Sequence, residues 1–478
     1  CVRSTNCELQ GLCNEYGVED ENRFAGSMTE HQIDDVSPSI VRNNNKCVLC
    51  RRCVAMCEKI QNIGVIGPTK RGFKTAIESA WNMPLGTTAC VNCGQCIEVC
   101  PTGALTEKDD TQKVWDALGN PDKFVVVQPA PAVRAALGEE FGMPMGSLVT
   151  GKMATALHRL GFDRVFDTDF AADLTIMEEA YELIDRLTNG GVLPMITSCS
   201  PGWIKYCETF HPDFIPNLSS CKSPHEMEGA IIKSYFAEKN GIDPKKIVVV
   251  SVMPCTAKKF ERARPELSVD GLADVDVVIT TRELGRMIKQ AGIDFPNLPE
   301  GDFDDMLGDS TGAGVIFGAT GGVMEAALRT AYEAVTGKTL EDVDFAACRG
   351  IAGVKEATID LNGTPLTIAV TSSTGLAGML LDQVREGKKH YAFIEVMGCP
   401  GGCVNGGGQP IVTVEQREKT DPRVLRAKAL YREDENKAIR KSHENPSIKK
   451  LYAEYLEKPN SHKAHHLLHT HYSARSKY

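Results

Sequence analysis

The stretch Glu395-Val-Met-Gly-Cys-Pro-Gly-Gly-Cys-Val-Asn-Gly-Gly-Gly-Gln-Pro410 combines two thiols, six glycines and two prolines within sixteen residues. A segment with so few large side chains cannot hold itself together by packing, and its glycines let the backbone approach a bulky group closely. The thiols of Cys399 and Cys403 could hold such a group. The stretch therefore predicts a loop wrapped around an iron-sulfur cluster. The competing interpretation is a flexible glycine-rich surface loop with two incidental cysteines.

Length and composition limit the class of protein. The chain has 478 residues, 42% of them hydrophobic, which is enough for two or three domains with cores of their own. A net charge of -10 argues against a nucleic-acid-binding surface. No apolar run approaches the roughly 18 residues that cross a bilayer. Eighteen cysteines at metal-ligand spacings are not a secreted disulfide framework, so we expect a soluble protein of a reducing, oxygen-poor prokaryotic cytoplasm.

Two identical cysteine patterns lie between residues 47 and 101. Each reads C-x-x-C-x-x-C-x-x-x-C, a spacing at which three thiols hold one 4Fe-4S cubane and the fourth completes the other cubane. A pair of zinc sites, or a thioredoxin-type pair at Cys93 and Cys96, does not explain eight thiols in two identical quartets. The pattern predicts one cluster held by Cys47, Cys50, Cys53 and Cys100, and a second held by Cys90, Cys93, Cys96 and Cys57.

Two further thiols, Cys1 and Cys7, stand in a C-x5-C pattern. Two thiols are half a cluster site. They are either incidental or part of a third 4Fe-4S cluster whose other ligands precede Cys1.

From Phe124 onward the sequence alternates between short apolar strands and amphipathic helices, which predicts α/β architecture. The expected helices include Asp173 to Leu187 and Arg282 to Ala291. The expected strands are Phe124 to Gln128, Val192 to Thr197, Ile247 to Met253, Val275 to Thr280 and Phe393 to Met397. In such folds ligands bind beyond the carboxyl ends of strands. Cys199, Cys255 and Cys399 each follow one of these strands, so we expect all three thiols in one cleft.

Three segments together resemble the signature motifs of the FeFe (di-iron) hydrogenases. They are Thr197-Ser-Cys-Ser-Pro-Gly-Trp203, Met253-Pro-Cys-Thr-Ala-Lys-Lys-Phe-Glu261 and the glycine-rich stretch quoted above. The resemblance covers the whole chain. It implies a two-lobed α/β catalytic domain preceded by an α+β ferredoxin-like domain with two 4Fe-4S clusters.

The resemblance also implies the active centre, called the H-cluster, which is a 4Fe-4S cubane joined to a di-iron unit with carbon monoxide, cyanide and a bridging dithiolate amine. By position, Cys255, Cys399 and Cys403 would ligate the cubane, Cys403 would bridge to the di-iron unit, and Lys258 would hydrogen-bond a cyanide. His225 stands where related enzymes often carry glutamine, and either tunes the pocket or is structural. The other expected wall residues are Ala130, Pro131, Met253, Pro254, Phe317 and Met397.

The pair Cys199-Ser200 departs from the common family form, which has two adjacent cysteines. If roles follow position, Cys199 relays protons to the bridging amine and Ser200 ligates iron through oxygen, a poorer match to a soft cluster. If the roles are exchanged, Cys199 ligates and the Ser200 hydroxyl relays. We favour the positional assignment.

Proton delivery requires titratable groups between the pocket and solvent. Glu179, Glu182 and Arg186 fall on one face of an expected helix, which by spacing alone indicates an ordinary solvated face with an ion pair. The resemblance instead implies a proton path from the relay thiol through Glu179, Ser219, Glu182 and Arg186.

The expected domains are residues 1–44, the remnant of an upstream iron-sulfur module; 45–118, the ferredoxin-like domain; 119–415, the catalytic domain; and 416–478, a helical extension resembling a small subunit.

Multimeric enzymes that couple hydrogen to NAD and ferredoxin often share the Cys-Ser pair and an ending like Leu468 to Tyr472. We therefore expect an electron-bifurcating complex with a flavin- and NAD-binding subunit, or with a formate dehydrogenase. The alternatives are a ferredoxin-linked monomer, and a non-catalytic iron-sulfur protein of cluster assembly or hydrogen sensing.

Overall fold

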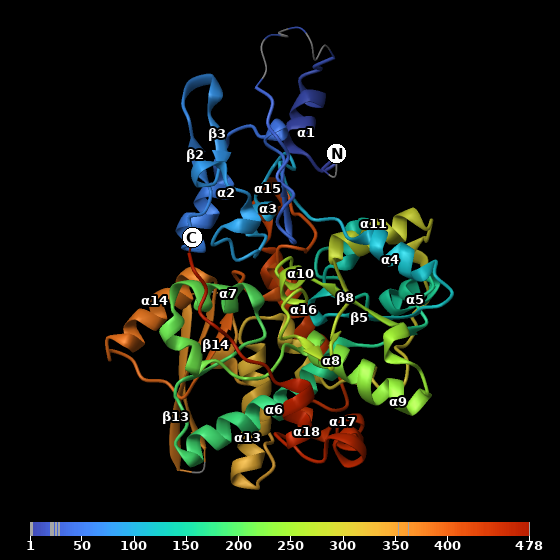
Figure 1. The fold of residues 1–478 in the computed structure, drawn as a ribbon, viewed down its shortest axis with the longest axis vertical. Helices are drawn as coiled ribbons and strands as arrows, with labels where there is room; N and C mark the ends of the chain where they lie inside the picture. Colours follow the sequence, from blue (N-terminus) through green and yellow to red (C-terminus); the bar gives the residue numbers. More distant parts are fainter. Residues whose placement is uncertain are drawn as a thin grey trace.

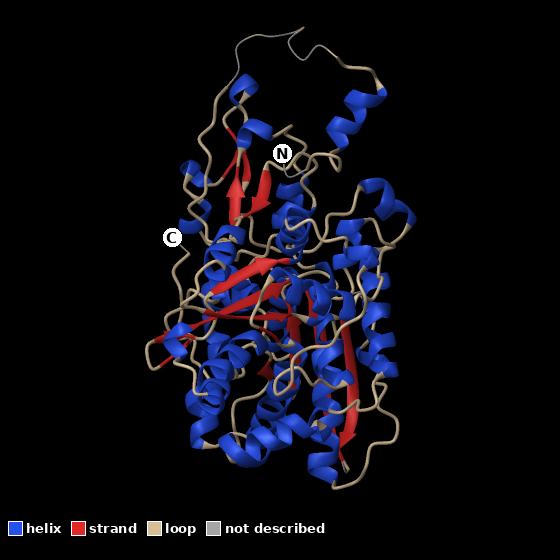
Figure 2. Ribbon diagram, turned by 90° about the vertical axis from the view of Figure 1, so that its right-hand side faces the viewer, coloured by secondary structure: helices blue, strands red, loops and turns tan. Residues whose placement is uncertain are grey.

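The computed structural model describes residues 3–19, 23, 26, 29–351, 353–361 and 363–477. A small N-terminal part lies at one end of the long axis, above a larger part in which helices surround the strands (Figures 1 and 2). Within the described ranges, no helix combines the length and the apolar character needed to span a membrane.

The N-terminal part contains two short antiparallel strand pairs. Strand β1 (Ile40–Arg42) pairs with β4 (Leu105–Glu107), and β2 (Gly67–Thr69) pairs with β3 (Ala76–Glu78). Its helices are α1 (Glu8–Glu15), α2 (Arg52–Ala55), α3 (Gln95–Glu98) and α4 (Thr111–Leu118). Helices α2 and α3 each begin after a residue in the left-handed region, Arg51 with φ 62° and Gly94 with φ 69°. These tight turns let the closely spaced thiols of each quartet face one centre.

The first large sheet is wholly parallel, with strand order β11-β8-β5-β6. Its strands are β5 (Phe124–Pro129), β6 (Arg164–Val165), β8 (Ile247–Met253) and β11 (Val277–Thr280). Strands β5 and β8 are apolar along nearly their whole length because helices cover both faces of the sheet. The helices of this lobe include α5 (Thr150–Leu160), α8 (Pro224–Ile231), α9 (Ala237–Asn240), α10 (Lys258–Glu261) and α11 (Thr281–Gln290).

The second large sheet has strand order β12-β13-β14-β7, in which only the β12–β13 pair is antiparallel. Its strands are β7 (Met195–Ile196), β12 (Val354–Leu361), β13 (Thr364–Ser372) and β14 (Phe393–Met397). The helices beside it include α7 (Pro201–Phe210), α12 (Gly312–Val315), α13 (Gly322–Thr336) and α14 (Thr374–Arg385). A separate hairpin joins β9 (Ser268–Val269) to β10 (Leu272–Ala273).

Helix α6 (Thr168–Asn189) connects the two lobes. Phe170 and Leu174 belong to the core of the first sheet, whereas Ile176 and Leu183 belong to the core of the second. Helices α8 and α13 pack against it. Because α6 is covered on both sides as far as Glu179, the carboxyl groups of Asp169, Asp173, Glu178 and Glu179 are removed from solvent, whereas Asp185 near its end is exposed.

The C-terminal segment consists of α15 (Val414–Lys419), α16 (Pro422–Asn436), α17 (Pro446–Leu451) and α18 (His462–Leu468). Helix α16 packs on α12, and α18 packs on α8. After α18 the chain is tied to the catalytic lobe, since Thr470 donates a 2.8 Å hydrogen bond to the carbonyl oxygen of Ser220. The C-terminal segment is thus helical and packed on the catalytic lobe.

The α/β architecture with two strand-based lobes and a small α+β part in front is confirmed, and the strands Ile247 to Met253 and Phe393 to Met397 have the predicted bounds. The prediction for Val192 to Thr197 was too long, because only Met195 and Ile196 form strand. Pro194 has no backbone N–H, so it cannot donate to the ladder. Strand β11 likewise begins at Val277 rather than Val275.

Candidate functional site

A cavity of about 740 Å³ lies at the carboxyl ends of β5, β7, β8 and β14. The loops after these four strands provide most of its wall, as expected for a ligand site in an α/β protein. Every residue expected in the pocket lines it, and most are apolar, which keeps water away from whatever the cavity holds. These residues are Ala130, Pro131, Cys199, Ser200, His225, Met253, Pro254, Cys255, Lys258, Phe317, Met397, Cys399 and Cys403.

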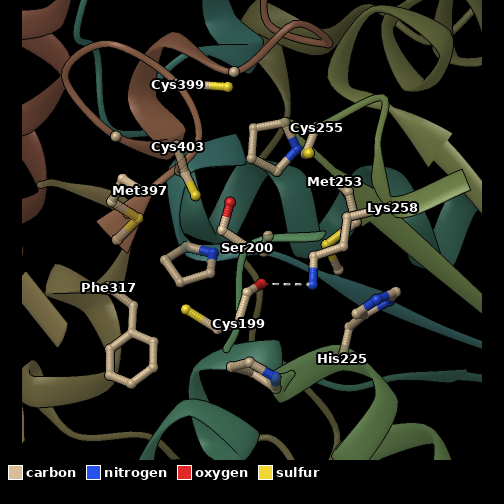
Figure 3. A pocket seen from close by; sticks show the side chains of 18 of the residues that line it. Cys199, Ser200, His225, Met253, Cys255, Lys258, Phe317, Met397, Cys399 and Cys403 are labelled. Carbon is tan, nitrogen blue, oxygen red and sulfur yellow. Dashed lines mark hydrogen bonds between the residues drawn. The ribbon is translucent and has the colours of Figure 1, made fainter. Parts of the chain in front are cut away.

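Three thiols, those of Cys255, Cys399 and Cys403, meet at one side of this cavity (Figure 3). Burial and the neighbouring Cys255 raise the pKa of Cys403 to about 12, against the opposing effect of Lys258. Burial likewise raises the pKa of Cys399 and of Cys255. Buried thiolates are therefore costly without a positive partner, and iron ions would provide one. Soft sulfur ligands in this number suit an iron-sulfur cluster.

The glycine-rich loop fits tightly against its surroundings. A Cβ atom on Gly406 would lie 2.2 Å from the carbonyl oxygen of Pro254, and one on Gly402 would lie 2.6 Å from the backbone nitrogen of Thr320. Gly401 and Gly402 have φ of 89° and 94°, in the region that favours glycine. The glycines are thus required by close backbone contact, and the interpretation as a flexible surface loop was wrong.

Lys258 extends into the cavity from α10 and donates a 3.1 Å hydrogen bond to the carbonyl oxygen of Cys199 (Figure 3). Its ammonium also lies 2.7 Å from the carboxylate of Glu261. Burial disfavours the charged lysine, but Glu261 outweighs this effect and raises the pKa of Lys258. The cavity therefore contains one fixed positive charge.

His225 lies beside this pair, with Nε2 2.7 Å from Glu261 and Nδ1 3.1 Å from the Ser251 hydroxyl. Burial and the charge of Lys258 lower the pKa of His225 to about 4. The ring is thus neutral near pH 7. Although burial acts in the opposite direction, Lys258 and His225 lower the pKa of Glu261 to about 2.

Cys199 and Ser200 point to different sides of the cavity. In Figure 3 the Ser200 hydroxyl is directed toward the side that holds Cys255, Cys399 and Cys403, whereas the Cys199 sulfur is directed toward Phe317. The Ser200 hydroxyl accepts a 3.0 Å hydrogen bond from the backbone N–H of Gly398. Burial, followed by the charge of Glu179, raises the pKa of Cys199.

Glu179, Ser219, Glu182 and Arg186 form a continuous series from the interior to the surface. Burial raises the pKa of Glu179 to about 8, with Glu182 adding to the shift and the Ser219 hydroxyl opposing it. Ser219 donates a 3.1 Å hydrogen bond to Glu182, which pairs with Arg186 at 2.6 Å. Glu179 is buried, whereas the side chains of Glu182 and Arg186 are 13% and 14% exposed. The interpretation as an ordinary solvated face was therefore wrong.

The two cysteine quartets of the N-terminal part line two separate cavities of about 430 and 400 Å³. The first contains Cys47, Cys50, Cys53 and Cys100, and the second contains Cys57, Cys90, Cys93 and Cys96. Each cavity thus brings together the four thiols expected for one cubane. The fourth thiol of each set, Cys100 in the first cavity and Cys57 in the second, comes from the other sequence quartet.

The second of these cavities lies next to the catalytic one. A Cβ atom on Gly407 would lie 2.4 Å from the carbonyl oxygen of Cys93, and Thr256 donates a 2.7 Å hydrogen bond to the carbonyl oxygen of Asn92. Gln61 donates a 2.8 Å hydrogen bond to the carbonyl oxygen of Gly398. The loops that carry the cysteines of the N-terminal part are thus in direct contact with the loops that carry the cysteines of the catalytic cavity.

Cys1 lies outside the described residues, and Cys7 directly precedes α1 with a half-buried side chain. Their expected cluster therefore stays a prediction. Three further polar residues, Glu261, Ser220 and Glu395, were not predicted from the sequence. Glu395 accepts hydrogen bonds of 2.6 and 2.7 Å from the backbone N–H groups of Gly321 and Met324. Only Glu261 had a sequence signal, since it lies one helical turn after Lys258.

Comparison with protein-family models gives three matches along the chain. Residues 123–407 match the iron only hydrogenase large subunit, C-terminal domain, which covers more than half of the chain. The chain belongs to the iron-only (FeFe) hydrogenase family. Residues 30–110 of this hydrogenase match a 4Fe-4S dicluster domain, and residues 420–475 match the iron hydrogenase small subunit. The cofactor set is therefore the H-cluster and two 4Fe-4S clusters.

Known hydrogenases are similar over most of the chain. The NADP-reducing hydrogenase subunit HndD of Solidesulfovibrio fructosivorans is 53% identical in an alignment that spans 100% of this chain and 82% of that protein. Iron hydrogenase 1 of Clostridium pasteurianum is 45% identical over 99% of this chain and 82% of its own length. A solved variant of the FeFe hydrogenase from Chlamydomonas reinhardtii is 44% identical, with a TM-score of 0.69 over 77% of this chain and 100% of that one.

The non-catalytic alternative has weaker support. The cytosolic iron-sulfur assembly component 3 of Rattus norvegicus is 30% identical over 81% of this chain and 83% of its own length. Because relatives named as hydrogenases are much more similar, the comparisons favour a hydrogen-converting oxidoreductase.

Proposed function

We propose that this chain is the hydrogen-converting subunit of a larger redox enzyme, and that it interconverts dihydrogen with protons and electrons in the cavity between its two sheets. The observation that carries this proposal is the convergence of Cys255, Cys399, Cys403 and Lys258 on one cavity, next to a buried series of proton-carrying side chains.

The residues around the cavity fit the H-cluster of the family. Cys255, Cys399 and Cys403 would hold the cubane, and Cys403 would bridge to the di-iron unit. When bound, this group supplies the redox chemistry that splits dihydrogen heterolytically. Lys258 would donate a charge-assisted hydrogen bond to an anionic ligand of the iron, because its ammonium is buried and positively charged in the cavity wall.

Ser200 and Cys199 take the roles that their positions suggest. The Ser200 hydroxyl faces the three thiols, which supports it as the fourth ligand of the cubane (Figure 3). The Cys199 thiol faces the other side of the cavity and is influenced by the charge of Glu179, which supports it as the proton relay.

Protons leave the cavity through Glu179, Ser219 and Glu182, and reach the surface beside Arg186. A carboxyl group with a pKa of about 8 both accepts and releases a proton near neutral pH. The Ser219 hydroxyl donates to Glu182 and can accept the proton of Glu179 in turn, so one hydroxyl passes a proton between the two carboxyl groups.

Cys57, Cys90, Cys93 and Cys96 would hold an inner cluster, and Cys47, Cys50, Cys53 and Cys100 an outer one. When bound, these clusters would supply one-electron transfer between the cavity and an external acceptor. The close contact between Gly407 and Cys93 keeps the inner cluster site near the cavity. The external acceptor is ferredoxin, an NAD(P)-linked flavin subunit or a formate dehydrogenase. The relative named as an NADP-reducing hydrogenase subunit favours the nicotinamide-linked partner. The domain boundaries after residues 44, 118 and 415, and the cytoplasmic location, stay predictions.

The proposal is tested on the matured chain by infrared spectroscopy and by hydrogen evolution from reduced methyl viologen. We expect carbon monoxide and cyanide bands together with turnover. A chain with full iron-sulfur content but neither bands nor turnover would leave the non-catalytic function. Copurification of a flavin subunit would support the nicotinamide-linked complex, and a chain that elutes alone and reacts with ferredoxin would contradict it.

A further inference from the structure

The C-terminal segment places a buried histidine next to the outer end of the proton route. The Ser220 hydroxyl lies 3.1 Å from Glu182 Oε2 and 2.8 Å from His469 Nδ1. One hydroxyl group therefore joins the carboxyl of α6 to an imidazole that follows α18. His469 is 9% exposed.

The opposite nitrogen of this imidazole is fixed by a buried carboxylate. His469 Nε2 lies 3.0 Å from Glu178 Oε2, and Glu178 is fully buried. Glu178 also accepts a 2.8 Å hydrogen bond from the backbone N–H of Asn460 and another from the Tyr452 hydroxyl. Because the Asn460 N–H and the Tyr452 hydroxyl both donate to Glu178, this carboxylate acts as an acceptor toward His469 as well, so Nε2 carries a proton and Nδ1 is the nitrogen that can exchange one.

The hydrogen bonds that link Glu182, Ser220 and His469 form in two protonation states. In one state, Glu182 is ionised and accepts from the Ser220 hydroxyl, while a charged His469 donates from Nδ1 to the Ser220 oxygen. In the other state, a protonated Glu182 donates to the Ser220 oxygen, and the hydroxyl donates to neutral His469. Conversion of the second state into the first breaks the Glu182 and Ser220 O–H bonds, and it forms a new Ser220 O–H bond and an N–H bond on His469. One proton thus moves from Glu182 to His469, and no heavy atom has to move.

We propose that Ser220 and His469 form a second outlet of the proton route, which branches at Glu182 and reaches solvent through the C-terminal helix. This inference rests on the proposed function. The His469 ring packs 4.0 Å from the exposed His465 ring, and a turn of the charged imidazole away from Ser220 and Glu178 brings its N–H to the surface beside His465, where water takes the proton. Glu178 stabilises the imidazolium that forms in between.

The groups that face His469 fit a proton relay better than a metal site. Glu182, Cys221 and His469 have ligand atoms within 4.8 Å of one another, which is a spacing that could hold an ion. However, Arg186 places a permanent positive charge 2.6 Å from Glu182, and both ring nitrogens of His469 already have hydrogen-bond partners. The charged or titratable neighbours are Glu178 and Glu182 of α6, His465 of α18, and the Cys221 thiol.

Two replacements of His469 test the outlet in the matured full-length chain. In His469→Gln the amide keeps a polar group at the site but cannot carry a proton, and we expect hydrogen evolution from reduced methyl viologen to fall about 3- to 10-fold. The loss stays moderate because Glu182 itself reaches the surface. His469→Ala leaves space, and added imidazole is expected to restore its turnover. The matched control is His466→Gln, which replaces an exposed histidine of α18 and is expected to leave turnover unchanged.

Iron content and the infrared bands are measured for every variant, so that a folding defect is separated from slow proton transfer. Full turnover in His469→Gln would overturn the proposal. So would a loss in His469→Ala that imidazole does not restore, because that result indicates a structural role only. A parent chain without turnover would instead contradict the proposed function.

Discussion

Lys258 donates a 3.1 Å hydrogen bond to the carbonyl oxygen of Cys199 while its ammonium lies 2.7 Å from Glu261. Lys258 follows β8 of the first sheet, and Cys199 follows β7 of the second. The bond therefore joins the two lobes across the cavity. A buried positive charge is held there by Glu261, which in turn contacts His225.

Replacement of Lys258 by Met is expected to lower dihydrogen turnover about 10- to 100-fold, because a charge-assisted hydrogen bond contributes about 1.5–3 kcal/mol. The infrared bands of the di-iron unit should weaken, and the 4Fe-4S signals should remain. The matched control is Lys233→Met, which removes a mostly buried lysine with an equal 2.7 Å ion pair to Asp276 outside the cavity. Equal losses in both variants would contradict a specific role for Lys258.

Replacement of Glu179 by Gln is expected to lower turnover at least about 100-fold with unchanged iron content, because the amide cannot pass a proton to Ser219. Hydrogen evolution from reduced methyl viologen measures the effect. Asp185→Asn, an exposed substitution on the same helix, is the control and should keep full turnover. An active Glu179→Gln variant would remove this residue from the proton route.

The same substitution is expected to change the pH dependence of stability. The pKa of Glu179 is about 8 in the folded chain, and it is near 4.5 when the chain is unfolded. Between these values the unfolded state has lost the proton and the folded state retains it, so stability falls as pH rises through this window. Glu179→Gln removes this dependence. At pH 8 the variant should be more stable than the parent by at most about 5 kcal/mol. Below about pH 4.5 the difference in stability between variant and parent should vanish. Denaturant unfolding at both pH values measures this difference. Equal stability of variant and parent at pH 8 would contradict the raised pKa of Glu179.

The sequence carries local information well and tertiary information poorly. Ile247 to Met253 is a continuous apolar run, and its bounds were predicted because a strand covered on both faces needs no polar alternation. The thiols that share one cluster stand at recurring spacings or directly after predicted strands, so their grouping could also be anticipated. Ser220 and His469 are 249 residues apart, and no periodicity relates them. Their contact depends on how the C-terminal segment docks, which only the structure gives.

Replacement of Cys53 by Ala is expected to remove one cluster from the N-terminal part. Cys53 is buried in the cavity that also contains Cys47, Cys50 and Cys100. Iron analysis should show a loss of about four iron atoms per chain, because alanine offers no ligand atom and leaves a four-ligand site with three thiolates. Reduction of an external acceptor should fall further than dye-driven hydrogen evolution. Cys13→Ala is the control, because Cys13 lines neither cluster cavity. A full iron content in Cys53→Ala would contradict the ligand assignment.

Ser200 distinguishes the two assignments of the cubane ligands. If its oxygen completes the cubane, Ser200→Ala should lose most of the catalytic cluster's iron, whereas Ser200→Cys should keep it, because a thiolate is the softer ligand for iron. Ser200→Ala also loses the 3.0 Å hydrogen bond from the backbone N–H of Gly398, whereas the sulfur in Ser200→Cys is still an acceptor for this N–H. Iron analysis together with paramagnetic resonance of the reduced protein measures the outcome. Full iron content with slow turnover in Ser200→Ala would reverse the assignment, because Cys199 would then be the ligand and the Ser200 hydroxyl the proton relay.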